Sequence, residues 1–261
     1  MPEGPNMSMR RWRRLCCAAL LLSGCATSMP KTDEGSESTR SRADNYVQLG
    51  IEYAKQGDYK TAVAKLQKAL EIEPDFQNAH HVIAMVYNRI GDKQQAEQYF
   101  TRALELDPKD SQTLNDYGSF LCAGGKHQAA DELFARAVAN PLYATPEIAL
   151  ANAGVCAARA QNYPQAEKYL RAALSNNPRL PTALLEMADI SFRLNRYLPA
   201  RGYLQRYLES AGHTARSLWL GIRIERQLGD RDAAASYALA LKSKYPDSEE
   251  ARLFLETEGR R

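Results

Sequence analysis

The chain has 261 residues, of which 44% are hydrophobic and 25% are charged. This composition is typical of a soluble protein with a hydrophobic core, and the length allows one large domain or two small ones. The formal charge of +3 arises in residues 1–24, because the remaining chain has 30 basic and 30 acidic residues. Without a basic stripe, a nucleic-acid partner has little electrostatic support. No apolar run reaches the roughly 18 residues that a membrane-spanning helix needs.

The N-terminus has the pattern of a secretory signal peptide, a basic segment (MRRWRR) followed by about ten apolar residues. Either Met7 or Met9 is a possible true start. The apolar run ends in LSGC, with Cys25 last. This resembles the lipobox of bacterial lipoproteins, in which the signal is cut before the Cys and the Cys is acylated. The resemblance implies a signal peptide over residues 1–24 and a lipid anchor at Cys25; the alternative is an ordinary secretory signal with an incidental Cys.

The residues after Cys25 indicate where such a lipoprotein resides. In the lipoprotein family an Asp directly after the Cys tends to retain the protein at the inner membrane. Ala26 stands there, so the resemblance implies the outer membrane, facing the periplasm, with several acyl chains (palmitate among them) making the anchor stable. Residues 26–42 have one Met and no other large apolar side chain, so residues 25–42 are predicted to be the lipidated Cys and a flexible tether.

Six copies of one residue pattern then follow at a spacing of about 34 residues. The recurring positions are Gly50, Tyr53, Ala62, Leu66, Ala69 and Pro74; Tyr87, Ala96, Phe100, Ala103 and Pro108; Gly118, Leu121, Ala130, Phe134 and Ala137; Gly154, Ala157, Ala166, Leu170, Ala173 and Pro178; Ala188, Ala200 and Leu204; and Leu220, Gly221, Ala233, Tyr237, Ala240 and Pro246. From residue 43 to about 246 the chain therefore resembles the tetratricopeptide repeat, with its Leu-Gly-x-x-Tyr, Ala, Phe and Pro positions.

Each repeated position has a physical reason. Small residues in the first helix and at the start of the second let the two helices approach closely, and the aromatic or Leu residue fills the space between them. Gly57 and Gly91 supply the left-handed backbone of the turns, and Pro follows the second helix, which it cannot continue. Repeats bury their faces only against neighbours. The resemblance therefore implies an all-α, right-handed superhelix of six repeats over residues 43–246, with a concave groove.

The C-terminal segment, residues 247–261, is predicted to be a capping helix and tail. Asp247 to Glu250 have the spacing of a capping box. Leu253, Phe254 and Leu255 are expected to cover the last repeat.

No residue pattern supports catalysis, a metal site or a cofactor. The four histidines (His80, His81, His127 and His213) lack metalloprotease spacing, and none adjoins a recognisable nucleophile motif. No Gly-rich phosphate loop is present, and the carboxylates have the spacing of solvated helix faces. A non-enzymatic protein with no small-molecule substrate is predicted.

Cys122 and Cys156 are 34 residues apart, close to one repeat length. They fall at nearly the same level of two neighbouring first helices, where a disulfide is within reach. An oxidising periplasm favours a disulfide, and the alternative is a pair of small buried thiols that fill core gaps.

The groove is lined by first-helix residues that face away from the second helix. The repeat phase predicts a protein-binding groove in the second and third copies, lined by Asn78, His81, Met85, Asn88, Gln112, Asn115 and Ser119. Amides and a Met suit adaptable binding of an extended segment or helix. No row of Lys and Arg is expected there, which disfavours a carboxylate clamp. The alternative is that these side chains are merely solvated.

Two segments carry a closer resemblance, LNDYGSFLCAGGKHQAADELFARAVANPLYATPEIALANAGVC and SLWLGIRIERQLGDRDAAASYA. They are similar to the type IV pilus biogenesis and stability lipoproteins, the PilF/PilW family. The resemblance implies an outer-membrane lipoprotein needed for type IV pili, with the pilus secretin as protein partner. It also implies that Cys122 and Cys156 are the paired cysteines of that family.

Within that family, some members are pilotins that help the secretin reach the outer membrane and assemble, and others mainly stabilise the fibre. We therefore predict a pilotin whose anchor and groove hold a secretin subunit at the membrane. The alternatives are fibre stabilisation, a scaffold in another envelope machine, or an enzyme that uses the repeats as a docking arm; almost no chain outside the repeats is left for the last.

Overall fold

The computed structural model describes residues 34–259, so the expected signal peptide and Cys25 lie outside the described residues. Within this range the chain is all-α, as predicted, and no strand occurs. The helices are α1 (Glu34–Lys55), α2 (Tyr59–Ile72), α3 (Gln77–Ile90), α4 (Lys93–Leu106), α5 (Ser111–Ala123), α6 (His127–Ala139), α7 (Pro146–Arg159), α8 (Tyr163–Asn176), α9 (Pro181–Arg193), α10 (Tyr197–Ser210), α11 (Ala215–Leu228), α12 (Arg231–Lys244) and α13 (Glu249–Gly259). No helix of the described part is both long and apolar enough to cross a membrane.

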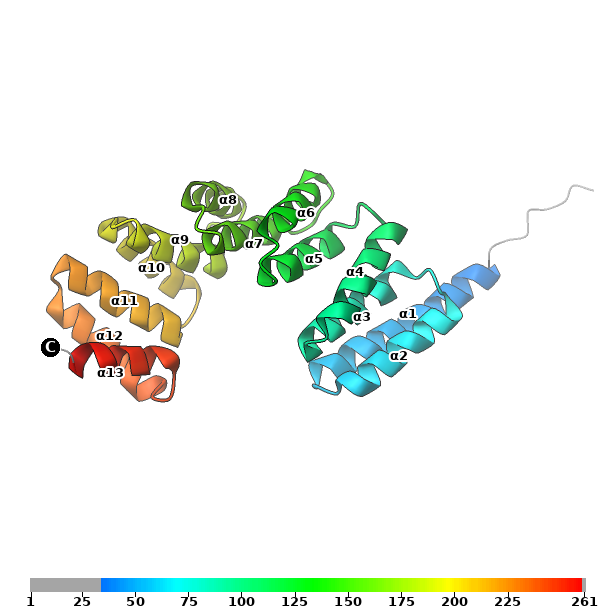
Figure 1. Ribbon diagram of the computed structural model, residues 1–261, viewed down its shortest axis with the longest axis horizontal. Helices are drawn as coiled ribbons and strands as arrows, with labels where there is room; N and C mark the ends of the chain where they lie inside the picture. The colour runs from blue at the N-terminus through cyan, green and yellow to red at the C-terminus, as the bar shows by residue number, and fades with distance from the viewer. Residues whose placement is uncertain (1–33, 260–261) are drawn as a thin grey trace, which may run out of the picture.

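The helices form six antiparallel pairs, from α1/α2 to α11/α12, and α13 packs on the last pair. The second helix of each pair also packs against the first helix of the next, and successive first helices are neighbours. Figure 1 shows the pairs following one another along an arch from α1 to α13. This arrangement confirms the predicted helix–turn–helix repeats.

In four repeats a Gly of the first helix lies opposite a large residue of its partner helix, 16 positions later in the sequence. In the other two repeats Ala84 and Ala188 stand 16 positions before Phe100 and Leu204. A Cβ added to Gly154 would lie 2.6 Å from Cγ of Leu170, and one added to Gly118 would lie 2.9 Å from the Phe134 ring. The predicted role of the repeated Gly, close approach of the two helices, is therefore seen in the packing.

This close approach predicts that two Gly→Ala substitutions have opposite effects. Gly154→Ala is expected to lower the free energy of unfolding by about 1–3 kcal/mol, because the new methyl group overlaps Leu170. Gly202→Ala, the matched control within α10, has no atom within 4 Å of its Cβ. It is expected to raise the free energy of unfolding by about 0.5–1 kcal/mol through backbone entropy. Urea denaturation measures both, and a loss of stability in both variants would contradict this account.

The turns within the six repeats use a left-handed residue, and in four of them the next side chain caps the second helix. Gly occupies the left-handed position in four turns, at Gly57, Gly91, Gly125 and Gly229. In the fourth and fifth repeats the position is taken by Gln161 (φ 59°) and Asn195 (φ 58°). Asp58, Asp92, Asn162 and Asp230 then accept a hydrogen bond from the backbone N–H three residues on.

Helix α1 begins at Glu34, inside the segment that was expected to be tether. Ala43 and Val47 are fully buried, and the Arg40 guanidinium lies over the Phe76 ring, 5.2 Å from its centroid. Phe76, the residue before α3, therefore gives this part of α1 a contact that the polar composition of residues 34–42 did not indicate.

The C-terminal cap differs in detail from the prediction. Ser248, not Asp247, caps α13, because its Oγ accepts the Ala251 N–H at 3.1 Å. Phe254 is 5% exposed and covers the last repeat, whereas Leu253 and Leu255 are 39% and 56% exposed. One turn of an α-helix presents only one of three consecutive side chains to the core.

Candidate protein-binding groove

The first helices of repeats two to four are joined by a polar network centred on Asp116. His81 Nε2 of α3 lies 3.0 Å from Asp116 Oδ2, and Gln112 Nε2 donates to the same oxygen at 2.9 Å. Asn115 Nδ2 donates to Asp116 Oδ1 at 3.1 Å. Asn152 Nδ2 of α7 donates to Asn115 Oδ1 at 2.9 Å. Helices α3, α5 and α7 are thus tied side by side through their side chains.

Because of this network, some of the predicted groove residues are buried and bond to other side chains of the protein. Asn115 and His81 are only 2% and 9% exposed, so their polar groups link helices. Ser119 Oγ donates to the Asn115 carbonyl at 3.0 Å. Asp116 and Asn152 were missed by the sequence analysis, because the repeat phase identifies a helix face without identifying the partners across it.

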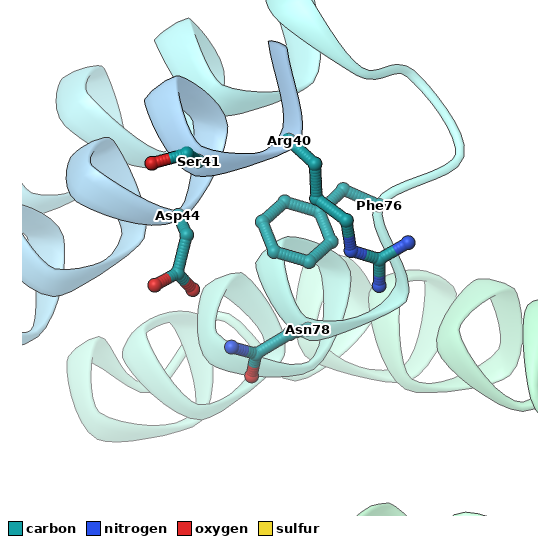
Figure 2. A pocket seen from close by; sticks show the side chains of 5 residues that line it. All are labelled: Arg40, Ser41, Asp44, Phe76 and Asn78. Carbon is teal, nitrogen blue, oxygen red and sulfur yellow. The ribbon is translucent and has the colours of Figure 1, made fainter. Parts of the chain in front are cut away.

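The other predicted groove residues lie nearer the surface. Met85 is 40% exposed, and Asn88 Oδ1 accepts a hydrogen bond from Lys93 Nζ at 2.6 Å. Asn78 lines a hollow of about 470 Å³ between α1 and the start of α3. Figure 2 shows its amide below Asp44, with the Arg40 side chain beside the Phe76 ring. The other lining residue is Ser41.

A second hollow, of about 370 Å³, spans the first helices of repeats four to six. Its lining residues are Val155, Ala158, Arg159, Gln161, Tyr163, Glu186, Asp189, Ile190, Arg193 and Arg216. The predicted lack of a basic row concerned the second and third repeats, whereas in this half of the molecule three arginines line the hollow. Arg159 and Arg193 are 34 residues apart, which is one repeat length. This spacing was a sign in the sequence that both arginines lie on the same face of the repeats.

The two buried carboxylates that line this hollow each form an ion pair with an arginine. Arg216 Nη2 lies 2.8 Å from Glu186 Oε2, and Arg193 Nε lies 2.8 Å from Asp189 Oδ2. The hydrogen bond to Asp189 raises the pKa of Arg193. Next to the hollow, the Arg223 guanidinium lies over the Phe192 ring, 4.2 Å from its centroid. Burial lowers the pKa of Arg223, against the opposing effect of Asp189.

Cys122 of α5 and Cys156 of α7 form a disulfide in the structure, with their Cα atoms 5.7 Å apart. His127 Nδ1 lies 3.8 Å from Cys122 Sγ and 3.5 Å from Cys156 Sγ. Within residues 34–259, these three side chains are the one close group of potential metal ligands. Metal binding needs thiolates, and sulfurs bonded to each other are not thiolates. As it stands, the group is a covalent link between the third and fourth repeats.

Comparison with known proteins identifies the same repeat that the helix pairs show. Family models of the tetratricopeptide repeat match residues 53–112, 99–132, 121–181, 157–215 and 217–248. The chain is 36% identical over 240 residues to the type IV pilus assembly protein PilF of Pseudomonas aeruginosa, covering 90% of this chain and 94% of that protein.

Two solved structures resemble this fold along most of its length. The P. aeruginosa pilF structure matches with a TM-score of 0.77 and 34% identity, covering 86% of this chain and 100% of the other. The crystal structure of PilW, a widely conserved type IV pilus biogenesis factor, matches with a TM-score of 0.77 and 32% identity, covering 82% of this chain and 98% of the other.

Proposed function

Since this chain belongs to the PilF/PilW family of type IV pilus assembly proteins, we propose that it is a pilotin that binds the pilus secretin. It is a tetratricopeptide scaffold and a type IV pilus assembly factor, not an enzyme. A binding role is best supported by the face of the repeats that the first helices form. There, α3, α5 and α7 are joined by a polar network, and α7, α9 and α11 surround a hollow.

In this proposal the groove residues act in two ways. His81 and Asn115, whose side chains bond to side chains of neighbouring first helices, keep those helices in register, and Ser119 bonds to the backbone of its own helix. The more accessible residues contact the secretin segment; these are Asn78, Met85, Asn88 and Gln112. Met85 supplies an adaptable apolar contact, and the amides supply both donors and acceptors.

Acyl chains on Cys25 hold the repeats at the outer membrane, facing the periplasm. Because α1 begins at Glu34, only residues 26–33 separate Cys25 from the first helix. Even fully extended, such a segment spans at most about 30 Å. The scaffold therefore stays close to the membrane, where a secretin subunit is held while its ring forms.

The test is the amount of secretin multimer in membrane fractions, measured on gels without boiling. Deleting the gene is expected to abolish the outer-membrane multimer and to leave monomer elsewhere. Cys25→Ser is expected to have the same effect, because the unacylated protein cannot reach the outer membrane. Cys17→Ser is the matched control, since that thiol lies inside the apolar signal segment, and it is expected to leave the multimer at the wild-type level.

Other outcomes identify the alternatives. A normal multimer level with Cys25→Ser would contradict the anchoring part of the proposal. An intact multimer with loss of pili after gene deletion would place the function in fibre stability. The client would then be sought among other pilus proteins by pull-down.

A further inference from the structure

The hollow between α7, α9 and α11 has more positive than negative charge. Arg159, Arg193 and Arg216 line it, and Arg223 interacts electrostatically with Asp189 and Arg193 beside it. Arg216 and Arg223 are seven residues apart in α11, two turns along one helix face. Only two carboxylates, those of Glu186 and Asp189, line the same hollow.

Those two carboxylates are already paired. Glu186 and Asp189 are 7% and 8% exposed and are bonded to Arg216 and Arg193. Within residues 34–259, no ion pair involves Arg159 or Arg223. Arg223 is nevertheless partly buried, and its guanidinium lies over the Phe192 ring. A guanidinium over a ring keeps its edge free for bidentate contact with a carboxylate.

The backbone at the rim of the hollow is also unusual. Gln161, a lining residue, has φ 59° where four other repeats use Gly. A non-Gly residue in this conformation is strained, and such strain is enriched at functional sites. Asn195, at the equivalent turn, accepts a hydrogen bond from Tyr197 Oη at 2.8 Å. Gln161 is exposed, and its amide can donate to a ligand oxygen.

We propose that this hollow binds the carboxylate side chains of an acidic peptide segment, with Arg159, Arg223 and Gln161 as the ligand-binding groups. The segment follows the row of first helices, and its apolar side chains contact Val155 and Ala158. A peptide is favoured over an anionic lipid headgroup because the lining continues over three successive repeats and includes apolar side chains. The inference rests on the proposed function in one respect: the groove's client presents the acidic segment.

The test uses the purified full chain in detergent and a short fluorescein-labelled peptide in which Glu alternates with Leu and Ala. Its counterpart with Gln in place of Glu is the uncharged probe. Fluorescence anisotropy is expected to show at least tenfold tighter binding of the Glu peptide, weakening as NaCl is raised. Arg159→Gln and Arg223→Gln are each expected to weaken binding about fivefold, and the double variant by more.

Arg231→Gln is the matched control, because it removes the same charge from an exposed position on α12. It is expected to change affinity less than twofold. If loss of the ring contact makes Arg223→Gln unfold, the exposed Arg159→Gln carries the test alone. Equal affinity for the two peptides would overturn the proposal, as would an equal effect of Arg231→Gln.

A further arm uses phosphatidylglycerol vesicles. Vesicle binding that depends on Arg159 and Arg223, without peptide binding, would assign the hollow to lipid and overturn the peptide proposal. Because the peptide assay contains no secretin, its failure leaves the pilotin proposal standing. Conversely, an intact secretin multimer after gene deletion leaves the peptide result unaffected.

Discussion

Replacing Cys122 and Cys156 together by Ala is expected to lower the free energy of unfolding by about 4 kcal/mol. The two residues are 34 positions apart and are disulfide-bonded in the structure. A cross-link closing a loop of this length removes chain entropy from the unfolded state, and the chain-entropy model gives about 3–4.7 kcal/mol for loops between 15 and 100 residues. Ala leaves no unpaired polar group at the buried site. Guanidinium denaturation, followed by far-ultraviolet circular dichroism, measures the change.

Reduction of the wild-type protein supplies the matched control. A dithiol reductant is expected to bring the wild type close to the double variant and to leave the variant unchanged. If the wild type kept its stability after reduction, the two cysteines would be gap-filling thiols, the alternative that their spacing left open. The link lies between α5 and α7, so we expect the loss to fall on the junction between the third and fourth repeats.

Phe100→Ala is expected to lower the free energy of unfolding by about 3–5 kcal/mol, the range for removing a buried Phe side chain. Phe100 is 0% exposed. Its ring lies 5.2 Å from the Tyr117 ring, at an interplanar angle of 11°, and 5.6 Å from the Phe120 ring. Both neighbours belong to α5, so the substitution removes packing within the second repeat and between the second and third repeats. Urea denaturation measures the loss.

Two variants test the reason for that loss. Phe100→Leu is expected to cost less, because Leu66, Leu170 and Leu204 occupy the equivalent position in other repeats. Leu142→Ala removes apolar atoms from a side chain that is 89% exposed, so a change below about 0.5 kcal/mol is expected. A comparable loss for Leu142→Ala and Phe100→Ala would show that burial does not account for the effect.

For the groove, the repeat phase predicted which residues share a helix face but not which side chains they contact. The phase placed His81, Gln112 and Asn115 on one face of the repeat array, and the structure brings all three to Asp116. It did not identify Asp116, which is adjacent to Asn115, as their shared acceptor. The direction of a side chain across to a neighbouring helix depends on the helix crossing and on the rotamer.

The arginines of the second half were missed for a different reason. The prediction concentrated on the second and third repeats, where Met and amide residues fall on the inner face. Arg193 and Arg216 approach the same pair of carboxylates only because α9 and α11 pack side by side. Sequence separation alone did not indicate that Arg159 and Arg223 are left without an ion pair in the described chain.

The sequence by itself determined the fold class, because helix pairs depend on local periodicity, and the resemblance of two segments to known proteins indicated the family. A Gly or Ala 16 residues before a Leu or aromatic residue specifies one helix pair without reference to the rest of the chain. Tertiary structure alone decided the start of α1 at Glu34, the use of Asn115 as a buried link, and the charge of the second hollow. Those features depend on contacts between different repeats, and contact energies between neighbours cannot be read from the pattern within one repeat.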